Sequence, residues 1–171
     1  NGDAFHADQL VIVWAGANDV FFQLGVFGAK VGAGESAPHA AAEAVAAVEQ
    51  AALDLASQVN RIVTKGATRV VVLNLPDIAS TPFGKAAQAQ VRQLIANLVL
   101  AVNGTLAASL AGTPAVLLDA FAAQDRQLAD PKAYGYTNVT GPACDPVKIA
   151  AVTGGLDHDG SSLFCSPLTL V

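Results

Sequence analysis

The chain has 171 residues, of which 53% are hydrophobic and only 13% are charged. Soluble domains average about 25% charged residues, so this apolar composition is typical of a folded core and excludes an intrinsically disordered chain. Lys and Arg number 9 against 14 Asp and Glu, which gives a net charge of −5, and the basic residues are scattered singly. Because binding to nucleic acid needs a concentrated basic surface, this charge argues against a nucleic-acid partner.

No stretch of the sequence predicts a membrane span. A spanning helix needs about 20 consecutive apolar residues. The most apolar stretch, 10–34, is interrupted by Asn18, Asp19, Gln23 and Lys30. The length favours one domain with a single sizeable core.

The first half of the chain predicts a strand followed by a long helix. Residues 10–15 form a continuous apolar run, which predicts a strand buried on both faces with Trp14 packed inside it. The glycine-rich stretch 25–38 is expected to be irregular. Apolar residues spaced three and four apart then predict a helix over 40–65, ended by Gly66.

The second half repeats this alternation. Strands are predicted over 69–74 and 115–119, and helices over 85–110 and 120–129, with loops and turns from 131 onward. Strands that alternate with helices are typical of right-handed crossover units on a parallel sheet. We therefore expect an α/β fold, although three strands are few for an open sheet.

In such a sheet the chemistry lies at the carboxyl ends of the strands. This rule selects three segments: 16–19, 74–82 and the residues from Asp119 onward. In the first of these, Gly16 permits a sharp turn, and Asn18 offers a neutral amide donor at the end of a rigid strand. Such a donor suits an oxyanion hole, and Asp19 could brace the loop by accepting backbone N–H groups. The alternative is an ordinary turn, because Gly, Asn and Asp are common in turns.

The residues 13–19, Val-Trp-Ala-Gly-Ala-Asn-Asp, match the Gly-x-Asn-Asp motif of a known family of esterases. The segment 74–82, which begins Asn-Leu-Pro-Asp, fits the next block of the same family. Three further blocks follow the same order: Leu118 to Phe121, Asp130 to Gly135, and Ala143-Cys144 with Phe164-Cys165. On these residues the sequence resembles the GDSL, or SGNH, serine esterases and lipases, in the branch that includes bacterial outer-membrane autotransporter esterases.

The resemblance implies a three-layer α/β/α sandwich with a flavodoxin-like parallel sheet. It also implies hydrolysis of a carboxylic ester by a Ser-His-Asp mechanism, with an ester or lipid substrate and no metal or organic cofactor. The family's oxyanion-hole asparagine corresponds to Asn18. The segments 25–38 and 74–82 are expected to border the acyl pocket. Secretion, to the periplasm or the bacterial cell surface, is the implied location.

Two motifs of that family do not occur in the chain. Its Gly-Asp-Ser nucleophile block should precede Gly16 at a distance, and its Asp-x-x-His block should follow Val171. Gly2-Asp3-Ala4 has no hydroxyl and no preceding strand. The chain contains no Met and starts Asn1-Gly2. We interpret 1–171 as a fragment of one SGNH domain, cut from a longer precursor whose remaining pieces are expected partners. The alternative is a catalytically inactive fragment or structural remnant.

The two cysteines, Cys144 and Cys165, lie in a turn-rich region without Cys-x-x-Cys spacing. We expect a disulfide between them, which would contribute about 3 kcal/mol and require an oxidising compartment. Two separate buried thiols are the alternative. A zinc site would need more ligands at tighter spacing.

Other candidate residues carry weaker signals. The segment 32–37 fits a Gly-x-Gly-x-x-Ala dinucleotide fingerprint, but no strand leads into it, and the acidic residue that follows, Asp54, falls inside a predicted helix. A Rossmann-like domain is therefore a remote alternative. His158 lies between two aspartates and is expected in a surface turn, while His6 and His39 are expected to face solvent.

Overall fold

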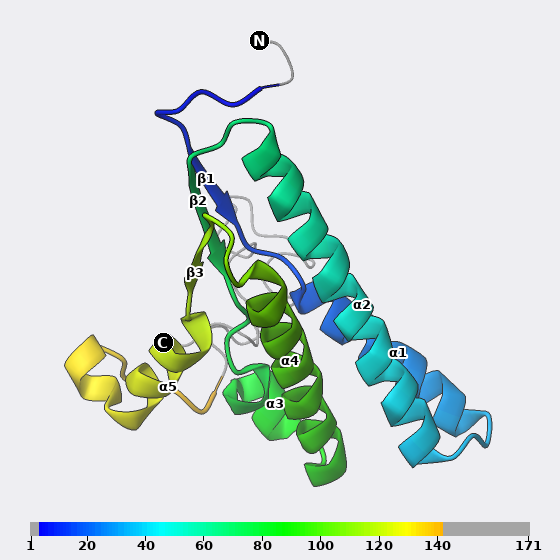
Figure 1. Ribbon diagram of the computed structural model, residues 1–171. Helices are drawn as coiled ribbons and strands as arrows, with labels where there is room; N and C mark the ends of the chain where they lie inside the picture. Colours follow the sequence, from blue (N-terminus) through cyan, green and yellow to red (C-terminus); the bar gives the residue numbers. More distant parts are fainter. Residues whose placement is uncertain (1–3, 142–171) are drawn as a thin grey trace, which may run out of the picture.

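The computed structural model describes residues 4–141, which form an α/β fold around a three-stranded parallel sheet (Figure 1). Strands β1 (Leu10–Val13), β2 (Arg69–Leu73) and β3 (Val116–Leu118) lie in the order β1-β2-β3. In the register, Val71 pairs with Ile12 on one side and with Val116 on the other. The three parallel strands predicted from the sequence are confirmed.

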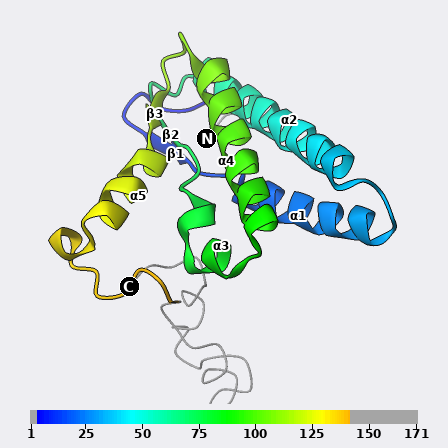
Figure 2. The same cartoon turned by 90° about the horizontal axis from the view of Figure 1, so that it is seen from below.

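Two long helices, α2 (Ala37–Thr64) and α4 (Ala89–Leu110), lie on one face of this sheet, and α1 (Ala17–Gly32) packs on them beyond the carboxyl end of β1 (Figure 1). Two shorter elements, η1 (Ile78–Ser80) and α3 (Pro82–Ala86), follow β2. The last elements are α5 (Ala120–Ala129) and η2 (Pro131–Tyr134). Figures 1 and 2 show α5 on the opposite side of the strands from α2.

The helix α2 forms because its sequence supplies a cap and a small-residue stripe. The Ser36 side chain accepts a hydrogen bond from the backbone N–H of His39 at 3.4 Å, and Pro38 occupies the first turn. The helix packs against α1 and α4, and one stripe of it is buried: Ala40, Ala44, Val48, Ala52, Ala56 and Val59. The predicted helix over 40–65 is therefore confirmed.

The predicted helix over 85–110 is present but divided. The chain leaves α3 at Ala87 and enters α4 at Ala89, with an extended backbone at Ala87. By length and composition α4 could span a membrane, with a mean hydropathy of 1.5. Its apolar side chains nevertheless form the centre of the core, because Ile95, Leu98 and Val99 have no exposed surface. This packing is that of a core helix in a globular fold.

The expectation that 25–38 is irregular was wrong for most of that stretch. Helix α1 continues to Gly32, and its residues Val20, Phe21, Leu24 and Phe27 pack on the core. The helical spacing of these apolar side chains stabilises α1 by more than the low helix propensity of its glycines costs. Gly25 and Gly28 lie on the exposed side of the helix. The dinucleotide fingerprint at 32–37 joins two helices rather than a strand and a helix, so the Rossmann-like alternative is excluded.

The expectation of strands buried on both faces was also wrong within residues 4–141. Val70 and Val72 point into the helical layer and are buried, whereas Leu10, Ile12, Val116 and Leu118 on the other face are exposed. Trp14 was expected to pack inside a strand, but it follows the end of β1 and is 61% exposed. Within residues 4–141 the long helices α2 and α4 lie on the opposite face, so no long helix of this part of the chain covers these side chains.

Candidate functional site

The site predicted at the carboxyl ends of the strands begins at the turn between β1 and α1. Gly16 has a φ of 111°, in the left-handed region that favours glycine. A Cβ atom at this position would lie 3.5 Å from Cγ1 of Val102 and 3.6 Å from Cδ2 of Leu75. The turn is thus held close to α4 and to the loop after β2, and it directs the chain at once into α1.

Asn18 lies in the first turn of α1, with Gly16 at the N-cap. Its side chain is exposed, and it hydrogen-bonds to no other group in the described part of the chain. The first N–H groups of a helix have no intrahelical partner, and the helix dipole makes this end favourable for negative charge. Within residues 4–141 the amide of Asn18 therefore remains available to an anion at this end of the helix.

The bracing role expected for Asp19 is not present. Asp19 is exposed in the first turn of α1, and its carboxylate forms no hydrogen bond among the described residues. At that position its negative charge complements the helix dipole. Its contribution is to helix stability rather than to the geometry of the turn.

The second and third segments of the predicted site meet in a polar pair. Asn74, at the end of β2, donates from Nδ2 to Oδ1 of Asp119 at 2.9 Å, and its Oδ1 accepts from the backbone N–H of Phe121 at 3.1 Å. Asp119 Oδ1 also accepts from the backbone N–H of Ala122 at 3.0 Å, which caps α5. Asn74 is only 8% exposed, so these bonds connect β2 to the start of α5 inside the protein.

Hydrogen bonds and charge repulsion shift the pKa values of two carboxyl groups beside this pair. The backbone N–H of Ala122 and the amide of Asn74 lower the pKa of Asp119. In α5, partial burial raises the pKa of Asp125, and the charges of Asp77 and Asp119 raise it further. The carboxyl edge of the sheet therefore carries several negative charges in proximity.

The loop after β2 is held by side chains from α4 and α5 and by a side chain of its own. Asn103 of α4 clamps Leu75, accepting from its backbone N–H at 2.8 Å and donating to its carbonyl at 2.8 Å. The buried Gln124 of α5 donates to the carbonyl of Asp77 at 3.1 Å. Thr81, also buried, donates to the carbonyl of Ile78 at 2.6 Å. These bonds fix the predicted segment 74–82 in place.

A cavity of about 540 Å³ opens at this edge between the strand ends and α5. Its apolar lining includes Trp14, Ala17, Pro76, Ile78 and Leu118. The prediction that 74–82 borders a pocket is in keeping with this lining, whereas no residue of 25–38 takes part. Ala17 lies next to Asn18, so the cavity reaches the first turn of α1.

The described residues hold no nucleophile with a base. No hydroxyl within 4–141 hydrogen-bonds to a histidine side chain, and Ser80 bonds to Asp77 instead. His6 and His39 are exposed, as expected from the sequence. The predicted disulfide partners Cys144 and Cys165, and His158, lie outside the described residues.

A separate cluster of charged residues lies where α1 meets α2. Single ligand atoms of Glu35, His39 and Glu43 lie within 4.8 Å of one another, a donor set that could hold a metal ion. The ammonium group of Lys30 already pairs with both glutamates, at 3.6 Å from Glu35. The cluster thus joins the end of α1 to the start of α2 by ion pairs, apart from the carboxyl edge of the sheet.

Together, these features define an α/β protein of the crossover type with its candidate site at the carboxyl ends of the strands. A family model for GDSL-like lipases and acylhydrolases matches residues 1–158. The chain therefore belongs to the GDSL-like lipase/acylhydrolase family. A comparison with curated proteins found no match. The family fold is a three-layer α/β/α sandwich, and residues 4–141 are consistent with an incomplete form of it, with three parallel strands and long helices on one side.

The polar pair Asn74–Asp119 and the contact from Gln124 were not predicted from the sequence as interactions. The signal for the pair was present, since each residue directly follows a strand. Gln124 gave no signal, because a glutamine in a short polar helix is expected to face solvent.

Proposed function

We propose that this chain contributes the oxyanion hole of a carboxylic ester hydrolase that uses a Ser-His-Asp mechanism. The observation that carries the proposal is the exposed amide of Asn18 at the N-terminus of α1, which has no hydrogen-bond partner among residues 4–141. The glycine turn and the helix fix the position of this neutral donor. Little free energy is therefore spent on reorganisation when negative charge develops beside it. The family match supports an acyl-hydrolase reaction.

In the proposed reaction, a serine attacks the ester carbonyl while a histidine accepts the serine proton. The carbonyl oxygen becomes negatively charged in the tetrahedral intermediate, and the Nδ2–H of Asn18 donates to it. The electron pair then returns to the carbonyl, the alcohol departs with the proton from histidine, and water hydrolyses the acyl-enzyme in the same way. Only the oxyanion donor belongs to the described residues.

The substrate is proposed to be an ester whose acyl group is apolar. The cavity beside Asn18 is lined by Trp14, Pro76, Ile78 and Leu118, which offer an apolar surface without charged groups. No metal or organic cofactor enters this mechanism. The remaining pieces of a common precursor are the proposed source of the serine and histidine. Export to the periplasm or cell surface, and kinship with the autotransporter branch, belong to the same proposal.

The proposal is tested on a purified preparation that is ready for assay. Denaturing intact-mass analysis determines which polypeptides accompany the 17.3 kDa chain, and a fluorophosphonate probe labels an activated serine. We expect hydrolysis of a p-nitrophenyl ester, loss of activity on labelling, and the label on a polypeptide that carries Gly-Asp-Ser. Hydrolysis that persists after complete labelling would refute the serine mechanism.

The second candidate is a catalytically inactive fragment or structural remnant. It is favoured by the absence of any hydroxyl–histidine pair within residues 4–141. A preparation that contains this chain alone, and neither hydrolyses esters nor reacts with fluorophosphonate, would establish it in place of the esterase.

A further inference from the structure

Asn103 of α4 binds both backbone polar groups of Leu75, the second residue after β2. Its Oδ1 accepts from the N–H of Leu75 at 2.8 Å, and its Nδ2 donates to the carbonyl of Leu75 at 2.8 Å. The pairing of β2 with β3 reaches Asn74, whose N–H donates to the carbonyl of Leu118 at 3.2 Å. Asn103 therefore continues the backbone pairing one residue past the sheet and fixes the position of Leu75.

The side chain of Leu75 packs on the turn at Gly16. A Cβ atom at Gly16 would lie 3.6 Å and 3.8 Å from the two Cδ atoms of Leu75, and 3.5 Å from Cγ1 of Val102. Leu75 and Val102 are each 1% exposed. The helix α4 holds Val102, whereas Leu75 belongs to a loop whose other side-chain bonds act from Asp77 onward. The position of Leu75 therefore depends on the two bonds from Asn103.

Gly16 in turn sets the start of α1 and the position of Asn18. The carbonyl of Gly16 accepts from the N–H of Val20 at 3.2 Å, which closes the first turn of α1, and Asn18 lies within that turn. Glycine populates many backbone conformations, so the neighbours of Gly16 must select the one with a φ of 111°. A displacement of Leu75 is therefore passed through Gly16 to the amide of Asn18.

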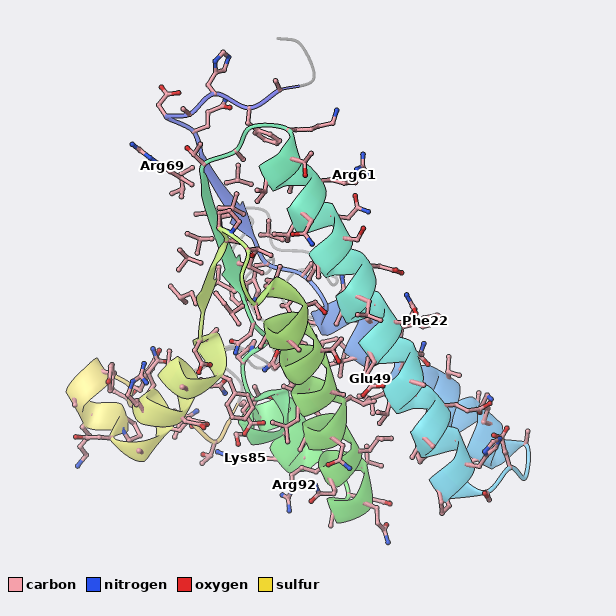
Figure 3. The ribbon with its side chains drawn as sticks, viewed as in Figure 1. Phe22, Glu49, Arg61, Arg69, Lys85 and Arg92 are labelled. Atoms are coloured by element: carbon pink, nitrogen blue, oxygen red, sulfur yellow. The ribbon has the colours of Figure 1, made fainter. Side chains whose placement is uncertain are left out.

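The helix α4 carries a second asparagine that makes no such contact. Asn97 is exposed, and its Oδ1 accepts from Gln93 of the same helix at 3.0 Å. Figure 3 shows Arg92 near the start of α4, and the helix runs from there toward the carboxyl ends of the strands. Asn103 lies about three turns after Arg92, where α4 reaches the turn at Gly16. The two asparagines thus allow the contact with Leu75 to be tested against a residue of the same type.

We propose that Asn103 is a positioning residue for the oxyanion hole, which acts on Asn18 through Leu75 and Gly16. Asn103 contacts neither the ester nor the reacting atoms. When its two bonds are lost, the amide of Asn18 no longer lies where the oxyanion forms, and a misplacement of about 1 Å can lower the rate about 10²-fold. The inference rests on the proposed function, because it takes the role of Asn18 from the proposed mechanism.

A double-mutant cycle in the ester-hydrolysing preparation tests this role. The cycle consists of Asn18→Ala, Asn103→Ala and the double variant, and kcat is expressed per serine labelled by fluorophosphonate. We expect Asn103→Ala to lower kcat about 10- to 100-fold and to change KM less than about twofold. In the Asn18→Ala background the same substitution should lower kcat less than about twofold, because residues that act as a unit are not additive. Asn97→Ala is the matched control and should leave both constants unchanged.

Leu75→Val tests the path to Gly16 independently, and it decides the question if Asn103→Ala does not fold. Valine keeps the backbone groups that Asn103 binds but has no Cδ atoms to face Gly16. We expect Leu75→Val to lower kcat about 3- to 10-fold, less than Asn103→Ala because the backbone stays in place. This effect should also disappear in the Asn18→Ala background.

Three results would overturn the inference and leave the proposed function standing. Equal falls in kcat from Asn103→Ala in both backgrounds would show that Asn103 acts independently of Asn18. A rise in KM with an unchanged kcat would show that Asn103 supports the apolar cavity instead of the oxyanion hole. An unchanged kcat in Leu75→Val would refute the path through Gly16.

Two other results would overturn the proposed function and the inference together. The first is a fall in kcat of less than about threefold for Asn18→Ala itself. The second is a preparation with neither ester hydrolysis nor a labelled serine.

Discussion

Asn74 and Asp119 connect neighbouring strands of the sheet at its carboxyl edge, with 2.9 Å between Nδ2 of Asn74 and Oδ1 of Asp119. The same two side chains also bind backbone N–H groups of Phe121 and Ala122, so they fix the start of α5. The apolar cavity next to Asn18 is bounded by α5 and by the loop after β2. Its shape therefore depends on this pair.

Asn74→Ala should lower the free energy of unfolding by about 1–3 kcal/mol, because it leaves buried polar groups without partners. Urea denaturation followed by circular dichroism measures the change. Asn97→Ala is the matched control. Asn97 is exposed on α4, where it accepts from Gln93 at 3.0 Å, and its loss should cost less than about 0.5 kcal/mol. An equal fall in the free energy of unfolding for the two variants would show that the pair Asn74–Asp119 contributes no more than a hydrogen bond on the surface.

Gly84→Ala should destabilise the protein by about 1–3 kcal/mol or more, because a Cβ at this position overlaps fixed backbone. The added atom would lie 2.4 Å from the carbonyl oxygen of Ala79 and 2.5 Å from its Cα. Gly104→Ala, in an open part of α4, should instead stabilise by about 0.5–1 kcal/mol through helix propensity. Thermal unfolding of both variants measures the contrast, and a neutral Gly84→Ala would disprove the packing of α3 on η1.

Asp125→Asn should stabilise the protein at pH 7 and have no effect at low pH. Partial burial, with the charges of Asp77 and Asp119, raises the folded-state pKa of Asp125. The ionised group therefore destabilises the folded state once the pH exceeds the unfolded pKa, about 3.9. Below that value both states are protonated and the difference vanishes. Solvent screening keeps the gain below about 1 kcal/mol.

Unfolding of Asp125→Asn measured from pH 3 to pH 8 checks this dependence. Asp8→Asn controls for the loss of one negative charge, because Asp8 is exposed at the other end of the sheet. A stabilisation that persists unchanged at pH 3 would contradict an electrostatic origin.

The sequence predicts the strands and the two long helices well because their apolar patterns are strong. It fails over 25–32 because three glycines suggest an irregular chain, whereas Phe21, Leu24 and Phe27 bury enough apolar surface to extend α1. An apolar run also does not reveal which faces of its strand are covered. The exposure of Ile12 and Trp14 depends on the layers packed around the sheet, which the local sequence does not specify.

At the candidate site, the sequence identifies positions better than interactions. Asn18 is predicted as a site residue because its tetrapeptide follows a strand, and it lies in the first turn of a helix, an end that favours negative charge. The bond between Asn74 and Asp119 depends on the register of β2 with β3, across 45 positions of sequence. Long-range register of this kind is not encoded in either segment alone.

The central claim is that Asn18 donates to the oxyanion of the tetrahedral intermediate. The most direct measurement is kcat of Asn18→Ala in the ester-hydrolysing preparation, with Asn97→Ala on the exposed side of α4 as the control. We predict a fall in kcat of about 10²–10³ for Asn18→Ala, the usual effect of losing one oxyanion donor, and no change for the control. A fall of less than about threefold for Asn18→Ala would contradict the claim, since an oxyanion donor is worth far more than that.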